Sequence, residues 1–405
     1  MFKIDDPKNN YKNVIHAFFL ALAITIAEPS TILPLMVHHF SDSVIIVGVF
    51  ASLLRGGAIM IQLYAAFHAQ AYKRVLPYLG KVFFFRWISW FSIGLSIFFI
   101  GDSNKTLTLF LIGTGLFFFS FSAGFGAIYF KELQAKLFSK EYRGTTMANR
   151  QIAGSIASII SGGVAGYVLN HYEAPLNYAY LFMVSSVFMV IGFLTFVTIE
   201  EPSKENVSVK EKQFKTFIQN SMVLLKKDKR LQQQIIAIFL SYSYFLSMPF
   251  VILNANSTFT LTGWMLGGFI TVQMLGSIIG STLLWRRINE YEKMLSLSFI
   301  FMITAFFVAV FADNVYTYAL IFLLFGIALD GFNISGMNLV IEIAPEEKRP
   351  VYTALQTNIV SLGLFFPILG GIILKYIGSY TVIYILSIVM LIGGFYISRH
   401  LKEIK

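Results

Sequence analysis

Blocks of about twenty apolar residues recur along the whole chain, separated by short polar segments. A helix needs about 20 residues, at a rise of about 1.5 Å each, to cross a bilayer. The pattern therefore predicts twelve transmembrane helices, over residues 13–36, 44–68, 82–101, 106–130, 145–169, 177–198, 232–254, 262–285, 294–312, 316–341, 351–373 and 380–398.

The segment between the sixth and seventh blocks, residues 199–231, differs because it is rich in charged side chains. It predicts two six-helix bundles, over residues 1–198 and 232–405, joined by a linker. Apolar residues recur within the linker at helical spacing, which favours an amphipathic helix at the membrane surface. These residues are Phe214, Phe217, Ile218, Met222 and Leu225. A solvated linker is an equally good interpretation of its first ten residues.

Composition supports a polytopic membrane protein. Hydrophobic residues make up 56% of the chain and charged residues only 13%, whereas soluble domains carry about 25% charged residues. The chain has no cysteine, which excludes disulfides, thiolate catalysis and cysteine metal sites. The adjacent His38 and His39 alone make a poor metal site, so we assign no metal and no cofactor. The first apolar block is too long for a cleavable signal peptide.

Basic residues are distributed unevenly between the two sides of the predicted helices. Of the 31 Lys and Arg residues, 26 lie on the side that holds both termini, and only Lys105 and Lys375 lie on the other. This asymmetry predicts cytoplasmic termini in a multi-pass protein, and we expect the bacterial inner membrane. It also accounts for the net charge of +10, so we expect no nucleic-acid partner.

The two halves carry an internal repeat. The loop after the fourth span places Glu141 two residues before Arg143, and the loop after the tenth span places Glu347 two residues before Arg349. The two arginines are 206 residues apart, about half the chain, and each following helix carries paired glycines. Parallel six-helix repeats with a substrate site at their interface are a known transporter plan.

These loops, over residues 140–145 and 344–352, resemble the acidic-then-Arg loops of the major facilitator superfamily, and the resemblance covers essentially the whole chain. It implies an all-α membrane protein of twelve helices in two six-helix bundles, with Arg143 and Arg349 at a cytoplasmic gate. Residues 70–81 keep the basic residues and a glycine of another family loop but lack its Asp, and residues 280–287 lack it too. The Gly-Pro pair of the family's antiporters is absent from the fifth helix.

Three charged residues lie well inside predicted spans, where an ionisable side chain is costly and needs a reason. Glu28 and Arg55 lie about 15 Å and about 18 Å from the loop between the first two spans, so they can pair. We expect Glu28 to carry a proton, and a purely structural ion pair is the alternative. Asp330 in span ten is a second proton-coupling candidate, and bonding to a neighbouring loop is its alternative.

Further polar side chains inside spans are candidates to line a substrate cavity, although helix–helix hydrogen bonds are the usual role of buried amides. Arg150 lies 206 residues before Gln356, so this repeated position is expected to face the cavity in both halves. The cavity candidates are Arg55, Gln62, Arg150, Gln273, Asn333 and Gln356.

The sequence therefore predicts a secondary active transporter of a small organic molecule, working by alternating access and coupled to protons. No Gly-rich phosphate loop is present, and neither a catalytic residue nor an enzyme is predicted. The 42 Phe and 20 Tyr and the scarcity of charge favour export. An uptake permease, a membrane-bound lipid-handling protein and a sensor on the same fold are the alternatives. We expect a monomer.

Overall fold

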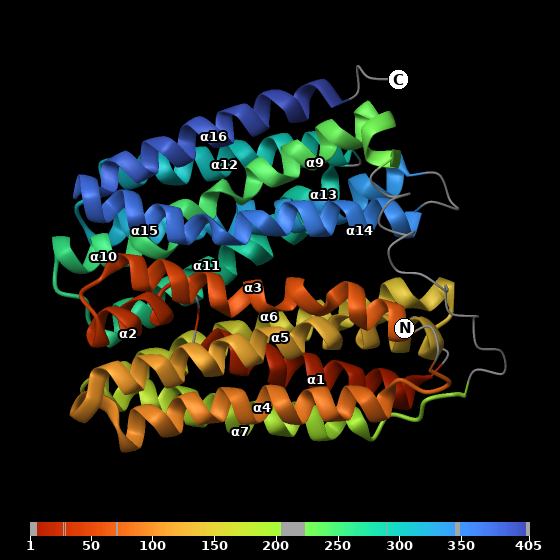
Figure 1. The fold of residues 1–405 in the computed structure, drawn as a ribbon, viewed down its shortest axis with the longest axis horizontal. Coiled ribbons are helices and arrows are strands. Elements are labelled where there is room, and N and C mark those ends of the chain that lie inside the picture. Colours follow the sequence, from red (N-terminus) through yellow and green to blue (C-terminus); the bar gives the residue numbers. More distant parts are fainter. Residues whose placement is uncertain are drawn as a thin grey trace. The chain divides into compact units, whose positions relative to one another are not determined.

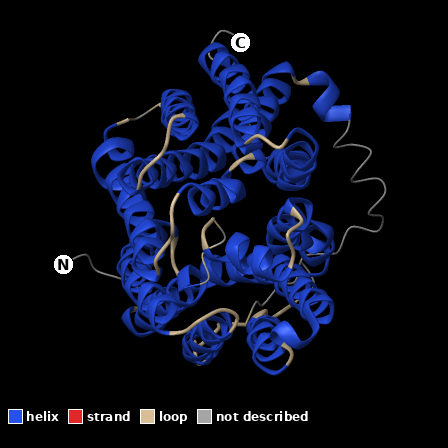
Figure 2. Ribbon diagram, turned by 90° about the vertical axis from the view of Figure 1, so that its left-hand side faces the viewer, coloured by secondary structure: helices blue, strands red, loops and turns tan. Residues whose placement is uncertain are grey.

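The computed structural model describes residues 6–26, 28, 30–69, 72–203, 223–288, 290–344 and 349–401. Over these residues the secondary structure is helical, with no strand (Figure 2). Ten helices within the described ranges are long and apolar enough to cross a membrane. The first two predicted spans complete the set of twelve. The first of these spans is broken in the middle, and the second has a shorter apolar stretch at Val44–Ile59.

Contacts between Cα atoms divide the chain into two compact units. The first comprises Met1–Phe40, Leu53–Lys212 and Thr262–Gly267, and the second comprises Ser41–Ser52, Gln213–Leu261 and Gly268–Lys405. The bundle boundaries at residues 198 and 232 remain predictions. Of the predicted amphipathic linker helix, residues 204–222 lie outside the described part of the chain.

The first six spans have the following bounds: α1 (Pro7–Ile26) with α2 (Ile32–Phe40), α3 (Val44–Ala69), α4 (Leu76–Phe99), α5 (Lys105–Leu137), α6 (Lys140–His171) and α7 (Leu176–Val197). In the first unit α1 packs on α6 and α7, while α4 packs on α5 and α7 (Figure 1). Short loops connect consecutive spans, which suits antiparallel packing of consecutive helices.

The last six spans have the following bounds: α9 (Lys229–Ser241) with α10 (Met248–Thr258), α11 (Gly263–Ile279), α12 (Tyr291–Val310), α13 (Val315–Ile343), α14 (Arg349–Val360) with α15 (Phe366–Ile377), and α16 (Tyr380–His400). In the second unit α12 packs on α13 and α16, and α16 also packs on α9.

The first span of each half is interrupted. The predicted continuous helix over residues 13–36 is instead two helices, because α1 ends at Ile26 and α2 begins at Ile32. The corresponding span of the second half changes to a 3-10 segment at Tyr242–Leu246 between α9 and α10. Such interruptions are found inside membrane proteins where the backbone is covered by protein or lines a cavity.

Glycines let the second and fourth spans of each half approach closely. A Cβ atom added at Gly124 of α5 would lie 2.5 Å from the carbonyl oxygen of Ala58 on α3. A Cβ atom added at Gly276 of α11 would lie 2.1 Å from the carbonyl oxygen of Leu323 on α13. Both distances are impossible for a larger residue without movement of the backbone. The two halves thus use small residues at equivalent helix crossings.

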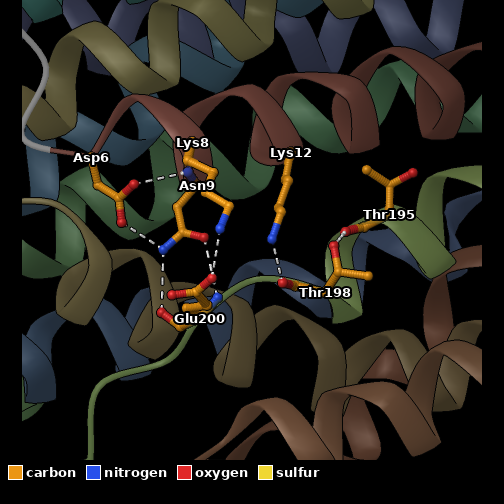
Figure 3. Close-up of polar contacts among 7 residues, drawn as sticks. All are labelled: Asp6, Lys8, Asn9, Lys12, Thr195, Thr198 and Glu200. Atoms are coloured by element: carbon orange, nitrogen blue, oxygen red, sulfur yellow. Dashed lines mark hydrogen bonds and ion pairs between the residues drawn. The ribbon is translucent and has the colours of Figure 1, made fainter.

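The start of α1 is fastened to the chain that leaves α7 (Figure 3). Lys8 Nζ lies 2.9 Å from Glu200 Oε1, and Asn9 exchanges two hydrogen bonds with the backbone of Glu200, at 3.2 and 3.1 Å. Lys12 Nζ donates to the carbonyl oxygen of Thr198 at 2.5 Å. The hydrogen bond from Lys8 lowers the pKa of the Glu200 carboxyl. The beginning of the first span and the end of the sixth therefore lie at the same end of the first unit.

Candidate functional site

Glu28 occupies the break between α1 and α2. Its backbone carbonyl accepts hydrogen bonds from the amides of Thr31, Ile32 and Leu33, at 3.2, 2.9 and 3.4 Å, and so begins α2. Its side chain is buried, and its Oε1 accepts hydrogen bonds from Ser30 Oγ at 3.1 Å and from Ser30 N at 3.4 Å. The carboxyl group is thus held at a point where the helix is already open.

Arg55 stands near Glu28 in the first unit. It lies on α3 and is half-buried, and its guanidinium group acts electrostatically on the Glu28 carboxyl. The structure therefore brings these two predicted residues together. Gln62 lies seven residues after Arg55 on the same helix, which is two turns, so the two side chains share one face of α3.

Arg150 of α6 turns toward α1. Its Nη1 donates to the backbone oxygen and to Oδ1 of Asn13, both at 2.6 Å, and lies 3.2 Å from Nδ1 of His16. Asn13 and Gln134 of α5 exchange two side-chain hydrogen bonds, at 3.2 and 2.9 Å. The Arg150 guanidinium also stacks over the ring of Phe130, 4.5 Å from its centre. Arg150 thus joins three helices of the first unit.

The counterpart of Arg150 in the second half makes an analogous junction. Gln356 of α14 accepts a hydrogen bond from Gln234 of α9 at 2.5 Å and donates to the carbonyl oxygen of Gly336 on α13 at 3.0 Å. Both repeated positions therefore bond to the first helix of their own half. The sequence expectation placed both at a cavity, and Gln356 does line one.

That cavity lies within the second unit and has a volume of about 180 Å³. Its walls come from α9, the Tyr242–Leu246 segment, α13 and α14. Polar and aromatic side chains of the lining include Tyr242, Tyr244, Asn333, Gln356, Thr357 and Ser361. Among the described residues, none of the lining side chains is charged. The structure thus brings together two predicted cavity residues, Asn333 and Gln356, and places hydrogen-bonding groups beside aromatic faces.

The remaining predicted residues lie apart from these groups. Asp330 of α13 accepts a hydrogen bond from Ser281, which belongs to the π-helical turn Gly280–Leu284 after α11. Gln273 is buried on α11, where its carbonyl oxygen faces Gly326 of α13. Arg143 lies in the first turn of α6, and Arg349 is the first residue of α14. The side chains of these two arginines lie outside the described part of the structure, so their gate role remains a prediction.

Comparisons with known proteins agree with this architecture. The model of the Major Facilitator Superfamily matches residues 233–403. The nucleoside transporter NupG has a TM-score of 0.68 at 14% identity, over 98% of this chain and 100% of that chain. The POT family transporter PepTSo has a TM-score of 0.73 at 10% identity, over 99% of each chain. A bacterial homolog of the human lysosomal transporter Spinster has a TM-score of 0.62 at 12% identity, over 99% of each chain. Residues 233–403 thus resemble the major facilitator superfamily, and the chain as a whole has the fold of these solved transporters. A comparison with curated proteins found no match.

Together with the ten apolar helices of the described ranges, this fold is that of a multi-pass membrane protein. Sequence reasoning missed three polar residues of its first unit: Asn13, His16 and Gln134. A signal for two of them was present, because Asn10, Asn13 and His16 recur every three residues and so share one face of α1. Their position at the start of an apolar block made them resemble the edge of a span.

Proposed function

We propose that this chain is a transporter of the major facilitator superfamily. It carries a small, uncharged organic molecule by secondary active transport coupled to protons, and Glu28 holds the coupled proton. One observation carries the proposal: a buried carboxyl lies at the break between α1 and α2, within the electrostatic reach of Arg55. Ionisable groups inside membrane proteins concentrate on transport pathways and proton relays.

The break gives this carboxyl a way to sense conformation. Burial disfavours the charged form of a carboxyl, whereas a nearby guanidinium and hydrogen-bond donors favour it. A rearrangement at the break that changes the separation of Glu28 from Arg55, or from the Ser30 donors, changes the proton affinity of Glu28. Ion coupling requires such a difference, because a ligand that binds two states equally shifts neither.

Glu28→Gln tests the proposal, because glutamine imitates a permanently protonated carboxyl. In proteoliposomes screened with a library of uncharged metabolites, the variant is expected to lose accumulation driven by a pH gradient. It should still exchange labelled for unlabelled substrate at equal pH, because exchange needs no change in protonation. The unaltered chain supplies the reference for both measurements.

Asp330→Asn is the matched control, because Asp330 is the other carboxyl predicted inside a span. It should keep gradient-driven accumulation if Glu28 is the coupling group. The proposal is wrong if Glu28→Gln still concentrates substrate with normal pH dependence. Loss of accumulation in Asp330→Asn alone would move the proton site to span ten.

The substrate class follows from the cavity of the second unit. Amide and hydroxyl groups of Asn333, Gln356, Thr357 and Ser361 stand beside tyrosine rings, and no charged group of the described residues lines the cavity. A few convergent polar groups among aromatic surfaces are typical of sites for small organic ligands. The lining supports an uncharged solute that has hydrogen-bonding groups and an apolar face.

The same lining favours a second candidate function, uptake rather than export. Export was predicted from the abundance of aromatic residues and the scarcity of charge, whereas the cavity also carries two amides. The sign of the driving gradient distinguishes the mechanisms. Proton symport, which suits uptake, accumulates substrate in vesicles with an alkaline interior, and proton antiport, which suits export, accumulates it in vesicles with an acidic interior.

A further inference from the structure

A groove of about 550 Å³ runs along the first unit between α4 and α5. Its lining is mainly aromatic: Tyr78, Lys81, Val82, Phe85, Ser89, Phe118, Phe121, Ser122, Phe125 and Tyr129. Phe85 and Phe118 are 61% and 52% exposed, so the groove opens to the surface of the unit. The two serines donate to carbonyl oxygens of their own helices, which leaves the walls apolar.

The length of the groove matches one leaflet of a bilayer. Lining residues on α4 run from Tyr78 to Ser89, and those on α5 run from Phe118 to Tyr129. Each set spans eleven residues of rise, or about 16 Å along its helix. The hydrocarbon core of a bilayer is about 30 Å thick, so the groove reaches from the interface to about the middle.

One end of the groove carries polar side chains that suit a lipid headgroup. Tyr78 stacks on Tyr72 with ring centres 4.0 Å apart, and Tyr129 lies beside both. Lys81 projects next to them, with Nζ 5.9 Å from the Tyr78 ring. Tyrosine and lysine at this depth are typical of the membrane interface. Within the described part of the chain, no carboxylate pairs with Lys81.

A second groove of about 510 Å³ provides the comparison. It lies in the second unit between α12 and α16, and it also has a lysine at one end, Lys293. There, however, Glu290 and Glu292 line the groove, and Lys293 Nζ lies 2.7 Å from Glu290 Oε1. The charge of that lysine is neutralised by its own chain. The charge of Lys81 is left for a ligand.

We propose that the α4–α5 groove binds an anionic phospholipid, with the phosphate at Lys81 and one acyl chain along the aromatic walls. The sequence places this end of α4 on the cytoplasmic side, so the lipid belongs to the cytoplasmic leaflet. A basic residue near the surface attracts anionic lipid by about 1 kcal/mol, equivalent to about fivefold in binding. The single free charge thus gives a selectivity that can be measured.

The test uses the full chain in nanodiscs that contain equal amounts of phosphatidylglycerol and phosphatidylcholine. The lipids retained after transfer to detergent are counted by native mass spectrometry. The unaltered chain and Lys293→Ala should retain phosphatidylglycerol preferentially. Lys81→Ala should lower that preference about fivefold, and Lys81→Arg should keep it. An unchanged preference in Lys81→Ala, or an equal loss in Lys293→Ala, overturns the proposal.

Two further arms separate the headgroup from the chain and from other occupants. Ser89→Phe fills part of the groove and should lower retention of both lipids, and unchanged retention overturns the acyl-chain assignment. Excess inorganic phosphate should not displace the lipid, and displacement would reduce the site to a simple anion contact. A lipid-free dimer in the mass spectrum would assign the groove to a second copy of the chain and overturn the proposal.

Discussion

His16 is buried on α1 among the rings of Phe83, Phe130, Phe193 and Phe196. Its Nε2 is buried without a hydrogen-bond partner within the described structure, while its Nδ1 lies 3.2 Å from Arg150. An unpaired buried polar group costs free energy, so His16 is expected to add little to the stability of the polar contacts around Arg150.

Asn13 is expected to add more to the stability of these contacts than His16. Its side chain bonds Arg150 through Oδ1 and bonds Gln134 through both Oδ1 and Nδ2. Asn13→Leu leaves those two partners incompletely paired inside the bundle. We expect it to lower the free energy of unfolding by about 1–3 kcal/mol. Thermal unfolding of the purified protein in detergent measures the loss.

His16→Phe is the matched comparison, because a phenyl ring fits among the existing aromatic side chains. The substitution removes one long contact to Arg150 but also removes the unpaired Nε2. We expect the free energy of unfolding to change by less than about 1 kcal/mol. If His16→Phe destabilises the protein as much as Asn13→Leu, the imidazole is an essential partner of Arg150.

Sequence reasoning at the residue scale identified several charged and amide side chains inside the predicted spans, but, apart from the Glu28–Arg55 pair, it did not identify their partners. The cost of burying charge singles out Glu28 and Arg55, because it depends only on residue type and surroundings, whereas the internal repeat singles out Arg150. The direction in which Arg150 points depends on how α1 packs against α6, and a single sequence does not specify how those two helices pack. Its contacts with Asn13 therefore became visible only in the structure.

At the scale of elements, the start of α4 depends on a residue far away in sequence. The loop before α4 lacks the Asp expected from the family resemblance. Instead, the Glu201 carboxylate accepts hydrogen bonds from the amides of Val75 and Leu76, at 2.9 and 2.8 Å. A carboxylate at a helix N-terminus satisfies free amides and interacts favourably with the helix dipole.

The same carboxylate forms a buried ion pair with Lys136 at the end of α5. Lys136 Nζ lies 2.6 Å from Glu201 Oε1, and the two side chains are 7% and 2% exposed. Glu201→Ala leaves a buried ammonium group and two helix amides without this acceptor. We expect a loss of about 3–5 kcal/mol in the free energy of unfolding, measured by denaturation in detergent.

Glu200→Ala is the control from the adjacent position. Glu200 also pairs with a lysine, Lys8, but both side chains are more than 70% exposed, at 73% and 72%. Exposed ion pairs contribute little to stability. Glu200→Ala should therefore unfold like the unaltered protein, and equal losses in the two variants would show that burial of the Glu201 pair is unimportant.

The other end of the linker is fixed in a related way. Asp228 Oδ1 accepts a hydrogen bond from the amide of Leu231 and so caps α9, while its Oδ2 accepts one from the Tyr352 hydroxyl. On either side of residues 204–222, a carboxylate therefore caps a helix: Glu201 caps α4 and Asp228 caps α9.

The number and order of the spans were predictable because a span is defined by the length of an apolar block. The interruptions of the spans were less predictable, because an apolar sequence has the same hydropathy whether it forms an α-helix or a 3-10 turn. Proline gave a partial signal. Pro249 and Pro367 stand in the first turns of α10 and α15, just after the 3-10 segments Tyr242–Leu246 and Ser361–Phe365. Long-range caps such as Glu201 have no local pattern at all.

At the scale of the whole molecule, the contacts of Lys8 and Asn9 with Glu200 constrain the topology. They hold the start of the first span beside the end of the sixth, so both lie on one side of the membrane. The bias of basic residues predicts that this side is the cytoplasm. Contact and charge are independent observations, and both require an even number of crossings between residues 8 and 200.

The absence of cysteine makes this topology directly testable, because any introduced cysteine is a unique label. Ser203 and Lys375 are exposed, and the predicted topology places them on opposite sides of the membrane. In intact cells a membrane-impermeant maleimide should label Lys375→Cys and should label Ser203→Cys only after permeabilisation. The reverse pattern would invert the protein in the membrane and place the lipid groove in the outer leaflet. Labelling of both sites in intact cells would contradict the odd number of crossings between them.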